Sequence, residues 1–258
     1  MKIILLPGWH EVADLMETFA NGRHGRYGFS AYGFESIVFP QGKLGLRHRI
    51  DEFAAFLDRL KAREPEAFPV AIFGFSAGGL IARGFLRAYP ERAAEVAGIV
   101  QLATPNGGLI TNYLVNIMQQ LHIREEELAD LDVASPFMTW LNGTSGHWIP
   151  TQDPKHKMWV LDRKPWVVPD GTRILAIVGR VPRFAGPTAS DGVVRSESCH
   201  LEDHIPTIFL DDSRANHLNM GAIWNPFTSL FRGFVQDDSM WPRVVELSVK
   251  FLKPEHSP

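Results

Sequence analysis

A serine flanked by small residues is the strongest chemical signal in the sequence. Residues 74–79 read GFSAGG, so Ser76 lies at the centre of a G-x-S-x-G pattern. The apolar run before it predicts a strand from Val70 to Gly74, and the periodic run after it predicts a helix from Gly79 to Tyr89. A sharp strand-to-helix turn exposes a serine hydroxyl in strained backbone geometry that only small neighbours permit. We therefore predict that Ser76 is a nucleophile.

A serine nucleophile needs a general base, which is expected late in the chain. The base takes the hydroxyl proton, and on a strand–turn–helix scaffold the expected chain order is serine, acid, histidine. His217 lies in a loop between Arg214 and Met220, just after the last predicted strand, where it would reach back over Ser76. The other late histidines precede that strand or lie near the end of the chain: His200, His204 and His256. We predict His217 as the base.

The acid should be a carboxylate that holds the tautomer of the base. Asp191 follows a predicted strand and precedes His217, within residues 188–194, which read TASDGVV. Its Asp-Gly pair is also ordinary turn chemistry. On the residues alone, four other carboxylates remain open, the last two of which lie nearer the end of the final strand: Asp170, Asp203, Asp211 and Asp212.

Acyl transfer also needs donors for a developing oxyanion. We predict the N–H of Ala77, which follows the nucleophile, and the N–H of Trp9, in the Pro7–His10 loop after the first strand. Gly8 would permit a close backbone approach there. The alternative interpretation of this loop is an ordinary strand-to-helix turn.

Short apolar runs alternate with amphipathic stretches along much of the chain. Besides the strand before Ser76, we expect strands at Lys2 to Leu6, Ser36 to Phe39, Ala97 to Leu102, Arg173 to Val178 and Thr207 to Leu210. Further helices are expected from Leu46 to Arg63 and from Ser239 to Leu252. This order predicts one α/β domain over residues 1–258, with a mostly parallel central sheet and helices on both faces.

The segment from Pro105 to Val168 interrupts the alternation. It carries several prolines and is expected to contain two helices. We interpret residues 106–168 as an inserted cap or lid. Its tryptophans either line an acyl pocket, cover the site or pack in the core: Trp140, Trp148, Trp159 and Trp166.

Composition excludes several classes of partner. With 26 basic and 29 acidic residues, a formal charge of -3 argues against nucleic acid or an anionic membrane surface. No apolar run approaches the roughly 18 residues of a membrane span. The N-terminal run is too short for a signal peptide, so we expect a soluble, cytoplasmic protein. Cys199 is the single cysteine, which rules out an intrachain disulfide and is best read as a packing residue.

A metal site must be considered at two histidines. His200 and His204 have helical spacing, with Glu202 and Asp203 between them. No third ligand is evident, and Pro206 disfavours a long helix there. We predict no metal and no cofactor.

Together these motifs resemble the bacterial lipase and esterase branch of the α/β-hydrolase superfamily. Residues 7–9 stand where such lipases carry His-Gly-x, and residues 104–108, TPNGG, resemble their Thr-Pro-His-x-Gly segment. Residues 190–194, 198–201 and 216–218 resemble the acid and base region of true lipases. The resemblance implies a triad of Ser76, Asp191 and His217. Calcium-binding relatives carry Asp two residues after the triad histidine, where this chain has Asn219, so no calcium site is expected.

The expected activity is hydrolysis of a small-molecule or lipid carboxylic ester through an acyl-enzyme on Ser76. An acyltransferase, a thioesterase or an amidase would use the same triad, because pocket shape and water access decide among them. A non-catalytic ligand-binding protein on this scaffold would usually lack a triad member, and none is missing here. The sequence does not determine the oligomeric state.

Overall fold

A parallel sheet forms the centre of the computed structural model. The structure describes residues 1–8, 13–22, 26–40, 42, 45–109, 129–150, 157–164, 166, 168–181, 190–191, 194, 196–199, 201, 205–215, 220 and 239–253. Six strands, all paired in parallel, have the order β2-β1-β3-β4-β7-β8. Their bounds are β1 Lys2–Leu6, β2 Glu35–Val38, β3 Val70–Phe75, β4 Val96–Leu102, β7 Ile174–Arg180 and β8 Thr207–Asp211. All six predicted strands are confirmed, with bounds that differ by two residues at most.

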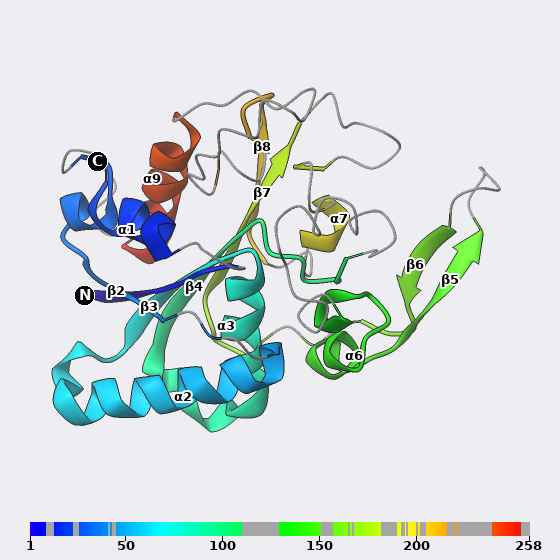
Figure 1. Cartoon of the computed structure of the whole chain (residues 1–258), viewed down its shortest axis with the longest axis horizontal. Coiled ribbons are helices and arrows are strands. Elements are labelled where there is room, and N and C mark those ends of the chain that lie inside the picture. The colour runs from blue at the N-terminus through cyan, green and yellow to red at the C-terminus, as the bar shows by residue number, and fades with distance from the viewer. Residues whose placement is uncertain are drawn as a thin grey trace.

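Helices cover both faces of the sheet, as predicted (Figure 1). On one side lie α2, Leu46–Arg63, and α3, Ala77–Ala88; on the other lie α1, Ala13–Asn21, and α9, Met240–Leu252. Alternate residues of a strand point to opposite faces. In β1, therefore, Ile4 and Leu6 join the core beneath α2 and α3, whereas Ile3 and Leu5 join the core beneath α1 and α9. Short 3-10 helices span Phe29–Tyr32, Pro65–Ala67 and Pro90–Glu95.

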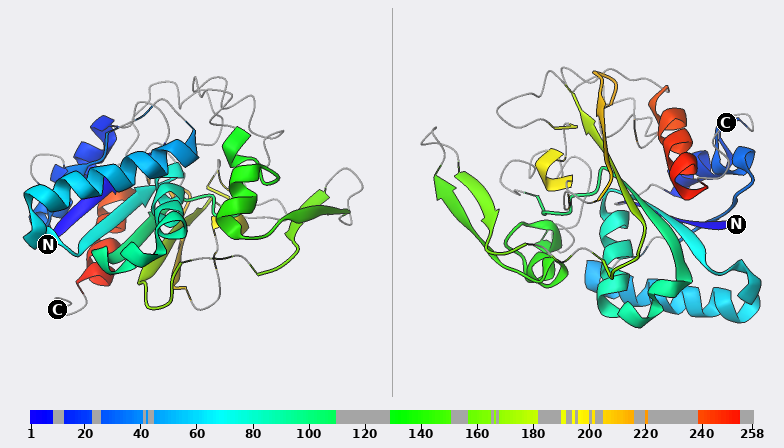
Figure 2. Two further views of the ribbon diagram at one scale, coloured as in Figure 1. Left: turned by 90° about the horizontal axis from the view of Figure 1, so that it is seen from below. Right: turned by 180° about the vertical axis from the view of Figure 1, so that it is seen from behind.

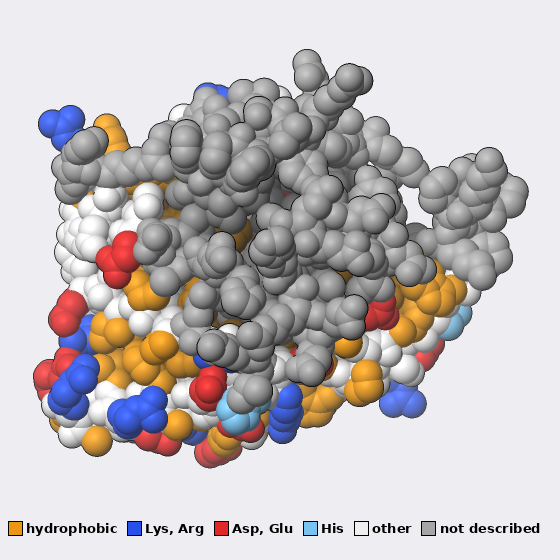
Figure 3. All heavy atoms as spheres, viewed as in Figure 1, with side chains coloured by type: hydrophobic (Ala, Val, Ile, Leu, Met, Phe, Trp, Pro, Cys, Tyr) orange, Lys and Arg blue, Asp and Glu red, His pale blue; other side chains and the backbone are white. Residues whose placement is uncertain are grey.

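Two helices show how burial decides local structure. Helix α2 has the predicted bounds and buries one apolar stripe, while its outer face mixes acidic and basic side chains (Figure 3). Helix α1 was not among the predicted helices. It has only nine residues, and isolated helices of that length are marginal in water, so packing of Met16 and Phe19 against the sheet stabilises it.

The segment after β4 contains an unpredicted hairpin besides helical structure. Its described part holds helical residues at 129–131, the helix α6, Pro136–Asn142, and an antiparallel hairpin of β5, Gly146–Pro150, and β6, Lys157–Leu161. Trp148 and Trp159 are directly opposite in the hairpin, with ring centroids 5.2 Å apart. Aromatic cross-strand pairs favour a hairpin over a helix. Both views in Figure 2 show the hairpin projecting away from the central sheet.

One further short helix, α7, Ser196–Cys199, follows β7. Among the helices that the structure describes, none combines the length and the apolar character that a membrane span requires.

Candidate functional site

Ser76 occupies the sharp turn between β3 and α3. Its backbone angles are φ 52° and ψ -122°, a conformation that residues other than glycine adopt only under strain. Two hydrogen bonds keep it there: Ser76 N donates to Leu102 O at 2.8 Å, and Ser76 O accepts from Gly79 N at 3.1 Å. The predicted strand–turn–helix setting of Ser76 is therefore present, with the helix beginning two residues earlier than expected, at Ala77.

Close packing explains the small residues of this serine turn, Gly74–Gly79. A Cβ on Gly78 would lie 2.2 Å from the carbonyl oxygen of Leu6, at the end of β1. A Cβ on Gly8 would lie 3.0 Å from the Cβ of Ser76. The chain leaving β1 thus runs directly beside the serine, and side chains at these glycines would push the two segments apart.

Ala77 is the first residue of α3 and is buried. The N–H groups in the first turn of a helix have no intrahelical acceptor, and the positive end of the helix dipole lies there. An oxygen anion beside Ser76 would therefore find a donor and a favourable field. The second predicted donor, Trp9, lies outside the described residues.

Asp191 lies in a tight turn after β7. Its Oδ1 accepts a hydrogen bond from Val194 N at 2.7 Å, and its own N donates to Val194 O at 3.2 Å. Ser190 O accepts from Val181 N at 2.9 Å, which joins this aspartate turn (Ser190, Asp191 and Val194) to the end of β7. Since β3, β4 and β7 are parallel neighbours, the serine turn and the aspartate turn follow the carboxyl ends of strands at one edge of the sheet.

Burial separates Asp191 from the other described aspartates that the sequence left open. Asp191 is 1% exposed. Asp170 and Asp211 are exposed, and Asp211 pairs with Arg180. Asp212 pairs with Arg214 at 2.6 Å, and hydrogen bonds from that guanidinium lower the pKa of Asp212 to about 2. Of the described candidates, Asp191 alone is enclosed by protein.

Several predicted residues lie outside the described residues, so their roles stay predictions: His217, His200, Glu202, Asp203, His204, Asn219 and His256. Within the described part of the chain, the structure brings together no three His, Cys, Asp or Glu side chains that could hold a metal ion.

Sequence reasoning missed a chain of buried amides behind the serine turn. Gln101, near the end of β4, donates from Nε2 to Gly79 O at 2.9 Å. Its Oε1 accepts from Asn106 Nδ2 at 2.9 Å, and the same amide nitrogen donates to Cys199 O at 3.0 Å. One signal in the sequence could have indicated this chain: Gln101 is the one polar side chain in the strand sequence VAGIVQL, and a buried glutamine amide must find hydrogen-bond partners.

Arg83 of α3 joins this chain and is fully buried. It donates from Nη1 to Asn106 Oδ1 at 3.0 Å, and from Nη2 to Asn142 Oδ1 at 3.0 Å and Trp166 O at 2.6 Å. Burial and the nearby charge of Arg87 lower the pKa of Arg83 to about 9, so the guanidinium remains protonated at neutral pH. It connects α3 to the end of α6.

Cys199 is buried in the same core as α3, which agrees with its reading as a packing residue. Burial, together with the negative charge of Asp191, raises the pKa of its thiol well above the usual range. The thiol is therefore neutral and a poor nucleophile.

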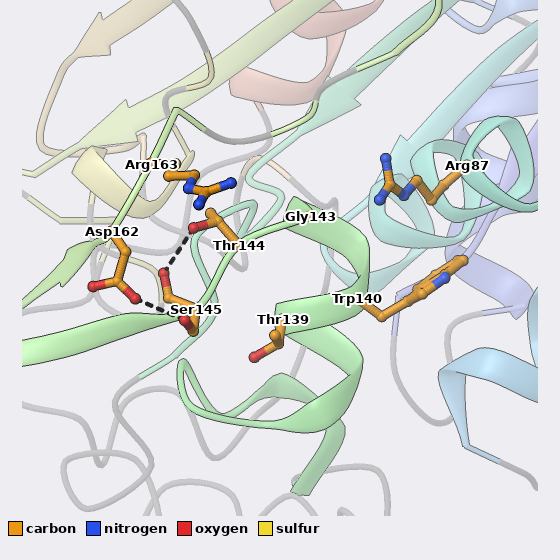
Figure 4. A pocket seen from close by; sticks show the side chains of 8 residues that line it. All are labelled: Arg87, Thr139, Trp140, Gly143, Thr144, Ser145, Asp162 and Arg163. Atoms are coloured by element: carbon orange, nitrogen blue, oxygen red, sulfur yellow. Dashed lines mark hydrogen bonds between the residues drawn. The ribbon is translucent and has the colours of Figure 1, made fainter.

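A pocket of about 510 Å³ lies elsewhere, between α6, β6 and the last turn of α3 (Figure 4). Its walls are formed by Arg87, Thr139, Trp140, Gly143, Thr144, Ser145, Asp162 and Arg163. It contains no candidate catalytic residue. Arg87 lies at the opposite end of α3 from Ser76, so this pocket is separate from the serine turn.

Comparison with known proteins gives matches in structure only. No family model and no curated protein sequence matches the chain. The mature form of the Bacillus licheniformis lipase BlEst2 is similar, with a TM-score of 0.56 and 13% identity over 89% of each chain. The metagenomic carboxyl esterase MGS0156 has a TM-score of 0.62 and 14% identity over 99% of this chain and 76% of the other.

A third similar structure is a soluble variant of the Saccharomyces cerevisiae monoglyceride lipase, solved with a substrate analogue. Its TM-score is 0.56 and its identity 11%, over 100% of this chain and 87% of the lipase. Similarity over nearly the whole chain, together with the six-stranded parallel sheet and its covering helices, establishes that this protein has the α/β-hydrolase fold.

Proposed function

We propose that this protein is a serine hydrolase that cleaves carboxylic esters through an acyl-enzyme on Ser76. One observation carries the proposal: Ser76 adopts a positive φ in the turn between β3 and α3, against the end of β1. Ser76 is 8% exposed, so the surrounding protein holds it in this strained conformation, and strained residues of this kind cluster at active sites. The structures similar to this one include a lipase, a carboxyl esterase and a monoglyceride lipase, which supports an ester as the substrate class.

In the proposed mechanism, His217 removes the proton of Ser76 as its oxygen attacks the ester carbonyl. Asp191 orients the imidazole and stabilises the imidazolium. The N–H groups of Ala77 and Trp9 hold the oxyanion, each worth roughly 3 kcal/mol by comparison with donor removal elsewhere. His217 then returns the proton to the leaving alcohol, and water activated by His217 cleaves the acyl-enzyme.

We further propose one α/β-hydrolase domain over residues 1–258, in which residues 106–168 form a cap for a small-molecule or lipid ester. The tryptophans of this segment divide into two groups. Trp140 and Trp166 pack against the core, whereas Trp148 is 39% exposed on the hairpin. Core packing therefore accounts for Trp140 and Trp166, whereas the exposed face of Trp148 is open to contact with other molecules.

The test combines labelling and turnover. Wild type is treated with one equivalent of a fluorophosphonate and assayed on p-nitrophenyl esters of increasing chain length. The Ser76→Ala variant should lose labelling and at least about 10⁴-fold of kcat. Ser145→Ala, at an exposed serine, is the matched control and should label as wild type does. Wild type that neither labels nor turns over an ester would refute the proposal.

A further inference from the structure

The serine turn and the segment that follows the aspartate turn are joined by one side chain. Asn106 lies in the loop after β4 and is 2% exposed. Toward the serine turn, Asn106 Nδ2 donates to Gln101 Oε1, and Gln101 Nε2 donates to Gly79 O. Gly79 N in turn donates to Ser76 O. Three successive hydrogen bonds therefore lead from Asn106 to the backbone of Ser76.

Toward the aspartate turn, Asn106 Nδ2 donates to Cys199 O, at the end of α7. Its loop is bound to the same helix twice more: Gly107 N donates to Ser198 O at 2.8 Å, and Ser198 Oγ donates to Gly108 O. Helix α7 begins at Ser196, two residues after Val194, whose N–H donates to Asp191 Oδ1, so α7 lies close to the aspartate turn. A displacement of the Asn106 side chain would therefore move its hydrogen-bond partners on both sides, Gln101 behind the serine turn and Cys199 in α7 beside the aspartate turn.

The chemistry of this position requires a primary amide. The amide nitrogen donates to two carbonyl oxygens, from Gln101 and Cys199, while Oδ1 accepts from Arg83. An aspartate at this position would have the same shape and would keep the contact to Arg83. Its second carboxylate oxygen, however, would face two acceptors, Gln101 Oε1 and Cys199 O, and could not donate to either. If Gln101 rotated its amide to donate instead, it would lose its bond to Gly79 O.

We propose that Asn106 is a positioning residue for the hydrolytic reaction, which sets the aspartate turn relative to Ser76 through Gln101 and Cys199. The inference rests on the proposed function, because positioning matters only if Ser76 and Asp191 act together. Asn106 touches neither substrate nor the reacting atoms in this scheme. Its effect is transmitted through backbone carbonyls at both ends.

The chain offers a matched pair of variants on one guanidinium. Asn106→Asp and Asn142→Asp each place a carboxylate of unchanged shape against Arg83, and both positions are 2% exposed. Only Asn106 is linked to Gln101 and Cys199. In Asn106→Asp the ion pair with Arg83 opposes the loss of two buried hydrogen bonds, so the melting temperatures of both variants are measured and activity is compared at a temperature where each is folded.

Asn106→Asp should lower kcat on p-nitrophenyl esters by about tenfold or more, with a smaller change in KM, because displacement of a positioned group is costly. The acid limb of its kcat/KM profile should move to lower pH, since a more distant Asp191 carboxylate raises the pKa of the base less. Asn142→Asp should keep kcat within about twofold of wild type, because an isosteric change away from the site is usually mild.

The outcomes separate this inference from the function on which it rests. Wild type that neither labels with the fluorophosphonate nor turns over would overturn both. Active wild type with an Asn106→Asp variant of unchanged kcat and pH profile would overturn the positioning role alone. Equal losses in Asn106→Asp and Asn142→Asp would also overturn it, because both would then act only through Arg83.

Discussion

The serine turn and the aspartate turn follow neighbouring parts of one sheet edge, but different forces hold them. Close backbone packing dominates at the serine turn, besides the two hydrogen bonds of Ser76: glycines at 74 and 78 let three backbone segments meet, and β3 is buried along its whole length. In the aspartate turn, Asp191 makes two hydrogen bonds to the backbone of Val194. Helix α7, which follows this turn, accepts a hydrogen bond from the amide of Asn106 at Cys199 O.

This difference predicts different kinds of failure. A side chain added in the serine turn must displace backbone, so its cost is steric and appears as lost stability. Around the aspartate turn, a substitution of unchanged shape can remove a charge, as in Asp191→Asn, or replace a hydrogen-bond donor by an acceptor, as in Asn106→Asp. The cost of such a change should appear as lost ester turnover.

The largest effect is expected for Asp191→Asn. The amide oxygen keeps the hydrogen bond from Val194 N, but the charge that would stabilise the imidazolium is lost, so kcat should fall by about 10³ to 10⁴-fold. The melting temperature should change little. Asp132→Asn is the control, because Asp132 Oδ1 accepts from Ala134 N in a similar turn, and it should leave ester turnover unchanged. Near-normal turnover in Asp191→Asn would assign the acid to another residue.

Gly78→Ala should destabilise the fold by about 3 kcal/mol, because its Cβ would meet Leu6 O at 2.2 Å and overpacking displaces backbone. Gly107→Ala serves as the control. There the nearest described atoms, on Ser198, lie at 3.5 Å, and the cost should stay below about 1 kcal/mol. Urea unfolding midpoints compare the two. Equal midpoints would show that close packing does not hold the serine turn.

Arg83→Met should destabilise by about 2 kcal/mol, because buried carbonyl oxygens of Asn106, Asn142 and Trp166 lose their donor. Arg63→Met, at a side chain that is 69% exposed, should change stability by less than about 0.5 kcal/mol. Urea unfolding at neutral pH measures both. A gain in stability in Arg83→Met would mean that burying the cation costs more than its hydrogen bonds return.

The smallest effect is expected at Asp212. Its folded pKa of about 2 lies below the ordinary value of 3.8, so its pairing with Arg214 stabilises the fold above about pH 4 and is lost as pH falls through about 2. Asp212→Asn should cost less than about 1 kcal/mol at neutral pH, since the pair is partly exposed, and nothing at about pH 1. Urea unfolding across this range tests the sign. An activity loss as large as that of Asp191→Asn would make Asp212 the acid.

Much of the fold could be predicted because its signals are local. Strand β1 and helix α2 have the predicted bounds, since apolar runs and three- to four-residue periodicity reflect burial on a sheet or on one helix face. Helix α1 and the β5–β6 hairpin were missed. Packing on the sheet stabilises α1, and the Trp148–Trp159 pair forms only when two segments meet.

The sequence by itself determined the setting of Ser76, because a G-x-S-x-G pattern between a strand and a helix encodes its own geometry within a few residues. It named Asp191 but left other aspartates open, since burial is not a local property. Only the tertiary structure brought Arg83, Gln101, Asn106 and Cys199 into one hydrogen-bonded chain. Buried polar groups must find partners, and which partners they find depends on segments that are distant in sequence and adjacent only after folding.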